Sequence, residues 1–279
     1  MASFNVVTDS TADLNTEERQ RYGISVIPLK IQFGLEGFKD MKNLNQEGWQ
    51  QRFLQGAWPT TSQPSIGDFM TCYDRLEGPV MSIHLSAGLS GTARTANAAA
   101  TAPLLRETRV IDSAMASAGL AYQVLAAAEI ARAGGTLDQA VKAVADLRCR
   151  TQANFMVDSL DYLQKGGRIG RLQTWAGIKL QIKPILYLEN GIIQVKERVR
   201  TRKQALMRLV KLSLAGGMPE KASVVHFLGT EAAEEVAAMF KSETGLEPEI
   251  RHISCVLGTH IGPGAVGLIF LAPNNLHGA

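Results

Sequence analysis

Small polar and glycine-rich segments recur in the first half of the chain, each where a strand-like run ends or a helix-like run begins. They are Asp9-Ser10-Thr11, Thr60-Thr61-Ser62-Gln63-Pro64-Ser65, Ser86-Ala87-Gly88-Leu89-Ser90-Gly91-Thr92 and Asp112-Ser113. A helix N-terminus offers unpaired N–H groups and partial positive charge, so hydroxyl-bearing turns there suit a carboxylate or a phosphate. N-capping alone explains any single segment, but four of them in one half of the chain favour an anion-binding site.

Two residues of the second half are also suited to an anion. Arg168 lies in a turn over residues 165–170, whose glycines end a helical run over residues 160–164. His260 is predicted in a glycine-rich loop that continues to Gly264. An arginine binds a carboxylate or phosphate through two parallel hydrogen bonds, and a histidine adds a pH-dependent donor. A surface ion pair for Arg168 and a backbone hydrogen bond for His260 explain them equally well, so both interpretations stay open.

Several catalytic motifs fail when they are read in context. Ser90 lies in Gly-Leu-Ser-Gly-Thr, where Thr92 replaces the second glycine that a hydrolase nucleophile turn requires. The stretch over residues 262–267 matches G-x-G-x-x-G, but a strand-like run follows it instead of a helix. The five histidines show no zinc-ligand spacing, and no phosphate-binding P-loop motif occurs. Binding is therefore favoured over catalysis, and no metal or cofactor is expected.

The first half alternates strand and helix, which predicts a parallel sheet with helices on its faces. Strands are predicted over residues 4–8, 24–29, 79–85 and 108–111. Capping-box spacing predicts helix starts at Ser10 with Asp13, at Ser65 with Asp68, and at Thr136 with Gln139. In such sheets ligands bind in the loops beyond the carboxyl ends of the strands, which is where three of the four polar segments fall.

The second half predicts an α+β domain with antiparallel pairing. Strands are predicted over residues 154–157, 183–188, 192–196, 223–227, 249–253 and 265–271, and helices over 202–214 and 231–242. Glu189-Asn190-Gly191 separates two of these strands, and Asn-Gly in that position is a hairpin signal. We place the domain boundary near Arg150, with an N-terminal α/β domain over residues 1–150 and a C-terminal α+β domain over 151–279.

Composition excludes several classes of protein. The chain has 279 residues, 46% of them apolar and 20% charged, with a net charge of +3, which argues against disorder. No apolar run is long enough to span a bilayer, and the N-terminus does not resemble a secretory signal, so a cytoplasmic protein is expected. Three distant cysteines predict neither disulfides nor a zinc site. One short basic run over residues 196–203 is a weak basis for nucleic-acid binding, which is not expected.

Seven segments stand in an order that is specific as a set, although each is weak alone. They are residues 7–14 (VTDSTADL), 61–65 (TSQPS), 89–92 (LSGT), Asp112-Ser113 with Ser117 and Gly119, Tyr162-Leu163 with 165–170, 183–186 (KPIL) and 260–264 (HIGPG). Together they resemble the DegV family of bacterial fatty-acid-binding proteins, which includes the acyl-carrier subunits of fatty acid kinase. The resemblance extends over residues 3–272 as one unit. The segments at 39–41 (KDM) and 180–182 (LQI) depart from the family pattern.

The resemblance implies a two-domain fold that encloses a long-chain fatty acid in an apolar tunnel between the domains. The residues that it assigns to the carboxyl group are the hydroxyls of Thr61, Ser62 and Ser90, with Gly91 and Thr92 alongside and Arg168 and His260 near the mouth. In the kinase systems a separate ATP-binding subunit phosphorylates the bound acid, so this chain resembles a carrier and not an enzyme. Transient contact with a membrane surface stays open.

Two alternatives compete with a fatty-acid carrier. The first is an enzyme that acts on a small carboxylated or phosphorylated substrate, with Ser90 or His260 as a catalytic group. A short polar pocket would favour this enzyme, whereas a long apolar tunnel favours lipid binding. The second is a DNA-binding regulator, which rests only on the basic run over residues 196–203.

Overall fold

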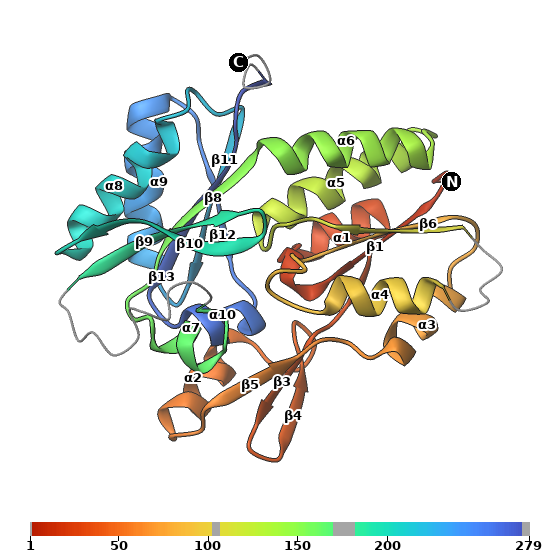
Figure 1. Cartoon of the computed structure of the whole chain (residues 1–279), viewed down its shortest axis with the longest axis horizontal. Helices are drawn as coiled ribbons and strands as arrows, with labels where there is room; N and C mark the ends of the chain where they lie inside the picture. Colours follow the sequence, from red (N-terminus) through yellow and green to blue (C-terminus); the bar gives the residue numbers. More distant parts are fainter. Residues whose placement is uncertain (1, 102–106, 170–181, 275–279) are drawn as a thin grey trace. The chain divides into compact units, whose positions relative to one another are not determined.

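The computed structural model describes residues 2–101, 107–169 and 182–274, and the chain divides into two compact units. Unit 1 comprises Met1–Cys149 and unit 2 comprises Arg150–Ala279. In Figure 1 the two units can be located by residue number from the colour bar. Three residues noted in the sequence, Gly170, Leu180 and Gln181, lie outside the described residues. Among the helices of the described ranges, none is long and apolar enough to cross a membrane.

Unit 1 contains a four-stranded parallel sheet with the strand order β2-β1-β6-β7. Its strands are β1 (Asn5–Asp9), β2 (Ser25–Ile27), β6 (Val80–His84) and β7 (Thr108–Asp112). The chain passes from β1 to β2 on one side and later returns to β6 on the other, so the strand order reverses between β1 and β6. The parallel sheet predicted for the first half is confirmed.

Helices cover both faces of this sheet. They are α1 (Thr16–Tyr22), α3 (Ile66–Asp74), α4 (Thr92–Ala100), α5 (Ala118–Arg132) and α6 (Leu137–Arg150), together with a 3₁₀ turn, η1 (Ser10–Ala12). Figure 1 shows α5 and α6 on one side of the sheet and α3 and α4 on the other. Every residue of the central strand β6 is buried, as expected for a strand covered on both faces.

A second, three-stranded antiparallel sheet in unit 1 was not predicted from the sequence. It has the order β4-β3-β5, with β3 (Lys30–Phe33), β4 (Glu36–Lys39) and β5 (Pro59–Ser62), and α2 (Gln46–Leu54) lies between β4 and β5 in the chain. Aromatic side chains join the helix to these strands: Phe33 contacts Trp49 edge to face, and Trp49 stacks on Phe53 with ring centroids 5.0 Å apart. Thr61 and Ser62 therefore lie on a strand that is paired to β3.

Two of the three predicted capping boxes are confirmed. Ser65 and Asp68 each bind the other's backbone N–H at the start of α3, and Thr136 and Gln139 do the same before α6. The prediction for Ser10 with Asp13 is wrong, because Asp9 caps η1 by accepting from the Thr11 N–H. Asp13 instead has a left-handed backbone with φ of 52°. Asp9, one residue before Ser10, can cap the same turn, and the spacing of the residues alone does not show which of the two is the cap.

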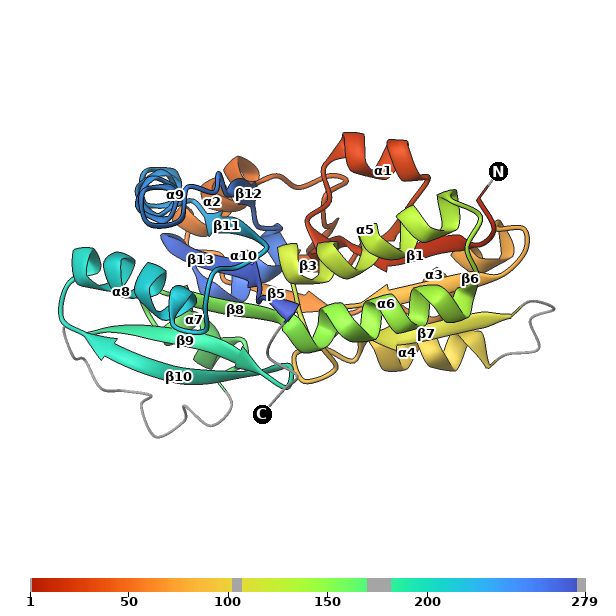
Figure 2. The ribbon, with the colours of Figure 1, turned by 90° about the horizontal axis from the view of Figure 1, so that it is seen from above.

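Unit 2 contains a six-stranded sheet with the order β10-β9-β8-β13-β11-β12, antiparallel except for the β11–β12 pair. The strands are β8 (Thr151–Met156), β9 (Lys183–Glu189), β10 (Ile192–Val199), β11 (Lys221–Phe227), β12 (Glu249–His252) and β13 (Ala265–Leu271). Asn190 and Gly191 form the turn between β9 and β10 with φ of 51° and 76°, so the predicted hairpin is confirmed. Figure 2 shows this hairpin at the edge of the sheet.

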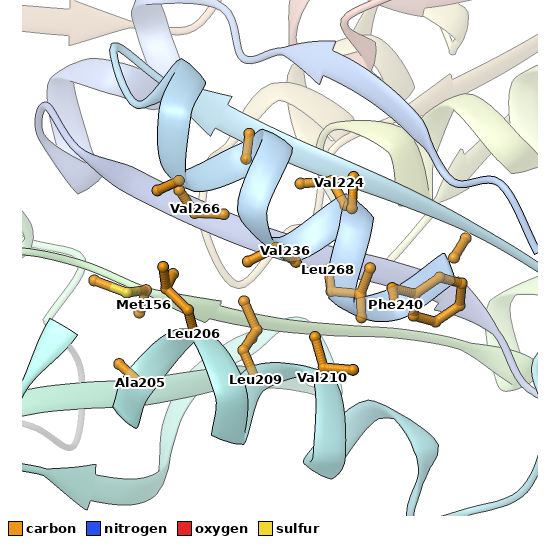
Figure 3. Close-up of a cluster of buried hydrophobic side chains, with 14 of the residues drawn as sticks. Met156, Ala205, Leu206, Leu209, Val210, Val224, Val236, Phe240, Val266 and Leu268 are labelled. Atoms are coloured by element: carbon orange, nitrogen blue, oxygen red, sulfur yellow. The ribbon is translucent and has the colours of Figure 1, made fainter. Parts of the chain in front are cut away.

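Two long helices pack against this sheet and form the core of unit 2. The helices of the unit are α7 (Asp161–Lys165), α8 (Arg202–Leu214), α9 (Thr230–Thr244) and α10 (Cys255–Ile261). Figure 3 shows Leu206 and Leu209 of α8 and Val236 and Phe240 of α9 within one cluster of buried apolar side chains, with Leu268 of β13 beside them. The predicted α+β organisation is confirmed, and α8 has the predicted bounds.

Candidate functional site

Within unit 1, Gln63 joins the two hydroxyl segments that the family resemblance assigns to a carboxyl group. Its Nε2 donates to Thr95 Oγ1 of α4 at 2.6 Å. Its side chain also lies against the Cα of Gly91, where an added Cβ would collide with Gln63 Oε1. Glycine at position 91 therefore permits the close approach of the two segments. Gln63 was not identified as a site residue from the sequence, because only the fold shows that it faces α4.

The predicted hydroxyl residues are neutral and differ in exposure. Thr61 is half-buried and Ser62 is exposed, both on β5. Ser90 is half-buried, and its Oγ lies 2.9 Å from Thr92 Oγ1. Gly91 is the N-cap of α4 and provides no side-chain cap, although Ser90 Oγ accepts from the Thr92 N–H at 3.3 Å. Hydroxyls thus adjoin a helix N-terminus, which is the combination that suits an anion.

Backbone hydrogen bonds fix the loop that carries Ser90. The Ser86 carbonyl accepts from the N–H groups of Leu89 and Ser90, both at 3.0 Å. The Ser86 N–H in turn donates to the Met115 carbonyl at 2.8 Å, and Ser86 Oγ accepts from the Gly88 N–H at 3.1 Å. The position of Ser90 is therefore determined by how Ser86 and its neighbours are held.

The remaining two polar segments of unit 1 bind the backbone of the protein itself. Asp112 Oδ1 accepts from the Ala87 N–H at 3.0 Å and from the Ala114 N–H at 2.9 Å. Ser10 Oγ accepts from the Leu29 N–H at 3.1 Å. These two of the four segments therefore stabilise loops through hydrogen bonds to the backbone. This is a structural role like N-capping, and it does not indicate ligand binding.

A fully buried polar chain in unit 1 was missed by sequence reasoning. The Tyr73 hydroxyl donates to Ser82 Oγ at 2.8 Å, Ser82 Oγ lies 2.7 Å from His84 Nε2, and His84 Nδ1 lies 3.0 Å from Asp9 Oδ2. Burial raises the pKa of Tyr73 to about 12, so it stays a donor. Ser82 is completely buried, so this serine, histidine and aspartate cannot act on a substrate. No motif links residues 75 positions apart in the chain.

Ser90 has no general base among its partners in the described part of unit 1. Its hydroxyl is hydrogen-bonded to Thr92, and the nearest buried histidine of this sheet, His84, is bonded to Ser82 and Asp9. A nucleophilic serine requires an adjacent base to take up its proton. Ser90 is therefore arranged as a hydrogen-bonding group.

In unit 2, Arg168 lies on the glycine turn that ends α7, as the sequence predicts. The Arg168 N–H donates to the Leu163 carbonyl at 2.9 Å and the Gly167 N–H to the Gln164 carbonyl at 3.0 Å, which is a Schellman motif. Gly167 has the positive φ, 69°, that this motif requires. The Arg168 guanidinium donates to the Gly166 carbonyl at 2.6 Å, and burial lowers the pKa of the guanidinium.

His260 is in a helix, so its predicted place in a loop is wrong. Ser254 caps α10 by accepting from the Leu257 N–H, and the helix continues through His260 to end at Gly262. A seven-residue helix with glycine and threonine inside it gives too weak a pattern to be predicted. Burial and, to a smaller extent, the positive charge of Arg168 together lower the pKa of His260 to about 4. A neutral imidazole therefore lies near a cation.

Close approach to glycine backbones positions this part of unit 2. The His260 ring lies against Gly166, and the Tyr162 ring against Gly262. The Asp158 carboxylate lies against Gly264 and accepts from Arg202 at 2.7 Å. An added Cβ at any of these three glycines would collide with its neighbour. In unit 2, close packing against glycine backbones therefore positions the group that contains Arg168 and His260.

Side chains of the types that bind metal ions do not cluster in the parts of the chain that the structure describes. Across those ranges no group of three or more histidine, cysteine, aspartate or glutamate side chains could hold an ion. The donors gathered in the two groups are hydroxyls, backbone N–H groups, a guanidinium and an imidazole, which suit an anionic ligand.

Comparisons with known proteins agree on one family. The family model described as "Uncharacterised protein, DegV family" matches residues 3–273. A DegV domain-containing protein of Streptomyces coelicolor is 37% identical over 95% of this chain and 96% of its own. A DegV family structure from Thermus thermophilus, described by its fatty acid binding, is 30% identical with a TM-score of 0.88. DegV of Bacillus subtilis, described as a fatty acid binding protein, is 32% identical with the same TM-score of 0.88. Each of these two structural matches covers 98% of this chain and 100% of the other.

Proposed function

The chain belongs to the DegV family, and from this premise we propose that it binds a long-chain fatty acid through the hydroxyls of Thr61, Ser62 and Ser90. The observation that carries the proposal is the meeting of the β5 segment with the N-terminus of α4 at Gln63 and Gly91. Solved structures at 30% and 32% identity that are described as binding fatty acids support the same ligand class.

The hydroxyl side chains of Thr61, Ser62 and Ser90 are chemically suited to an ionised carboxyl group. A buried carboxylate is costly unless its oxygens accept hydrogen bonds, and each bond to a charged group contributes about 1.5–3 kcal/mol. Ser90, Thr61 and the N–H groups at the start of α4 supply such donors. Because they are neutral, they bind the carboxylate without enclosing it in a tight ion pair, which leaves its oxygens available to a phosphoryl donor.

An apolar tunnel for the acyl chain supplies most of the binding energy in this proposal. Burial of about 14 methylenes at ~0.8 kcal/mol each contributes on the order of 11 kcal/mol. Association and ordering of the chain cost about 4–15 kcal/mol, so useful affinity requires a tunnel that exists before the ligand binds. The hydroxyl side chains of Thr61, Ser62 and Ser90 then determine the orientation of the acid, because they bind its carboxyl end.

Arg168 and His260 serve the anionic end of the ligand in this proposal. An arginine fork matches two oxygens of a carboxylate or a phosphate, and it gains most when the head carries the extra charge of a phosphoryl group. His260 is neutral above pH 4, so at pH 7 it offers one donor and one acceptor. We assign these two residues to an acyl phosphate as well as to the free acid.

A carrier role completes the proposal, in which the protein presents the bound acid to a separate ATP-binding kinase subunit. The lack of a base beside Ser90 in the described part of unit 1 favours a carrier over the alternative enzyme. With ATP and Mg²⁺ alone, the chain is therefore expected not to transfer a phosphoryl group to the bound fatty acid, so no ADP is released from ATP. ADP release by the purified chain would contradict the carrier role.

Mass spectrometry of the purified protein tests the ligand directly. We expect native spectra and lipid extracts to contain one equivalent of a long-chain fatty acid, and the delipidated protein to take up palmitate or oleate. Ser90→Ala weakens binding about 10-fold to 100-fold because one charged hydrogen bond is lost. A protein that purifies empty and rejects both added acids would exclude fatty-acid binding.

A further inference from the structure

The strand order of unit 1 reverses between β1 and β6, and the ends of these two strands are joined by the carboxylate of Asp9. Asp9 is the last residue of β1 and His84 is the last residue of β6. In open α/β sheets such a reversal opens a crevice at the carboxyl ends of the strands, where ligands commonly bind. In this chain the side chain of Asp9 extends across that point and binds Thr11, in the turn after β1, and Leu85, the first residue after β6.

Both oxygens of the Asp9 carboxylate are fully engaged. Oδ1 accepts from the N–H of Thr11 at 3.0 Å and from its hydroxyl. Oδ2 accepts from the Leu85 N–H at 3.0 Å and lies 3.0 Å from His84 Nδ1. Asp9 and His84 are both completely buried, and these donors replace the water that a buried carboxylate loses.

The other residues of the buried hydrogen-bonded series, Tyr73, Ser82 and His84, determine which atom donates each proton. Tyr73 donates to Ser82 Oγ, so the Ser82 hydroxyl proton is directed to His84 Nε2. His84 then carries its proton on Nδ1 and donates it to Asp9 Oδ2. The tautomer is assigned from this hydrogen-bond network, and it holds the imidazole in the orientation that serves Asp9.

The path from Asp9 to Ser90 is short and consists of backbone groups. Leu85, whose N–H binds Asp9, directly precedes Ser86. The Ser86 carbonyl accepts from the Leu89 and Ser90 N–H groups. A change at Asp9 therefore moves the anchor of the loop without removing any group that contacts a ligand.

We propose that Asp9 is the positioning residue for the loop over residues 85–92, and that His84, Ser82 and Tyr73 orient its carboxylate. This inference rests on the proposed function, because it assigns the loop the task of presenting Ser90 to a fatty-acid carboxyl group. A buried carboxylate and histidine in place of apolar side chains are weak evidence for a gain in stability alone. Their placement at the start of the Ser90 loop gives them a use in binding.

Asp112 provides a matched comparison because it holds the same loop in a different way. Both of its backbone bonds to this region, from Ala87 and Ala114, end on the single oxygen Oδ1. Asparagine at position 112 retains one carbonyl oxygen and can keep both bonds. Asparagine at position 9 cannot keep all the bonds of Asp9, because both oxygens of Asp9 accept hydrogen bonds and asparagine has only one. Its NH₂ group would face either the donors of Thr11 or those of Leu85 and His84, and two donors cannot form a hydrogen bond.

The test compares affinities for palmitate in the delipidated proteins, measured by displacement of a fluorescent fatty acid. We expect Asp9→Asn to weaken binding at least 30-fold and Asp112→Asn at most about threefold. Leu209→Ala, in the core of unit 2, serves as a control that lowers the melting temperature without changing affinity. An Asp9→Asn protein that is no weaker in binding than Asp112→Asn would overturn the proposal.

Two further measurements keep the proposal testable if Asp9→Asn does not fold. In the ligand-free wild-type protein, the amides of Leu85, Leu89 and Ser90 should already be protected from hydrogen exchange; protection that arises only after palmitate binds would contradict a pre-positioned loop. Nitrogen-15 spectra should show His84 protonated on Nδ1, and the opposite tautomer would contradict the assigned network. Failure of the wild-type protein to bind palmitate would instead exclude the proposed function.

Discussion

The two units hold their anion-directed residues by different physical means. In unit 1, the carboxylates of the buried Asp9 and the half-buried Asp112 bind loop N–H groups at the carboxyl ends of parallel strands, and the residues offered to a ligand are neutral hydroxyls. In unit 2, side chains lie directly against glycine backbones, and the residues offered are Arg168 and His260. The comparison teaches that unit 1 should be sensitive to the loss of hydrogen-bond acceptors, whereas unit 2 should be sensitive to an added methyl group.

The largest expected effect is on the steric fit of unit 2. Gly262→Ala places a Cβ into the Tyr162 ring, at a backbone with φ of 80° and ψ of 166° that only glycine adopts readily. We expect a loss of about 3 kcal/mol in the free energy of unfolding, measured by urea denaturation. Gly167→Ala is the matched control, since its φ is also positive, 69°, but its surroundings are open. It should cost about 1 kcal/mol, and equal losses would contradict the steric account.

An effect of intermediate size is expected when the pH is lowered, and it is a loss in the free energy of unfolding that arises in unit 2. His226 is buried, its Nδ1 accepts from the Gly229 N–H at 3.3 Å, and burial with the nearby His252 lowers the pKa of His226 to about 4. The folded state thus binds a proton less readily than the unfolded state, where the histidine pKa is about 6.5. Stability should therefore be full above pH 6.5 and should fall as the pH decreases toward 4, by about 2 kcal/mol for His226.

Urea denaturation between pH 7.5 and pH 4 measures this dependence. His260, with its pKa also lowered to about 4, adds a second contribution of the same sign. His226→Gln removes one titrating group and should flatten the fall between pH 6.5 and pH 4. The same slope in His226→Gln and in the wild type would show that the acid sensitivity arises elsewhere.

The smallest expected effect concerns the contact between the two hydroxyl segments of unit 1. Gln63→Ala removes the bond to Thr95 and the packing on Gly91. We expect palmitate affinity to fall about tenfold, which is 1.4 kcal/mol, while stability falls by less than about 1 kcal/mol because the bond is exposed. Gly91→Ala should weaken binding similarly, since its methyl group displaces Gln63. Calorimetric titration measures both, and unchanged affinity in both would show that this contact does not organise the site.

Local signals explain which parts of the fold could be predicted. Asn190-Gly191 sets a two-residue turn by itself, and Thr201 caps α8 by accepting from the Gln204 N–H, so the hairpin and this helix are where the sequence places them. The three-stranded sheet was missed because its strands are only four residues long and β5, with the sequence PTTS, has little strand character. The pairing of β3 with β5 joins Lys30 to Ser62 and Phe33 to Pro59, residues about 30 positions apart, and nothing in the local pattern shows this.

The candidate site divides in the same way. The types and order of Thr61, Ser62, Ser90, Arg168 and His260 are visible in the sequence. In unit 1 the contacts of Gln63 join the segments that carry the three hydroxyl residues, and in unit 2 Arg168 lies close enough to His260 to lower its pKa. The residues that position them were not predicted. Asp9 and His84 are 75 positions apart, and the contacts of Gln63 and Tyr162 with glycines depend on the fold. The residue types therefore predict which side chains could bind an anion, whereas the residues that position those side chains are identified only from the structure.

Carbon-13 spectra of palmitate labelled at its carboxyl carbon test the central claim, that neutral hydroxyls of unit 1 hold an ionised carboxylate. We predict a single bound carboxyl resonance, distinct from free palmitate, that stays ionised to a lower pH than palmitate in detergent micelles. It should shift in Ser90→Ala and in Thr61→Ala, and it should keep its position in Leu209→Ala. A missing bound resonance, or one that is the same in wild type and Ser90→Ala, would contradict the account.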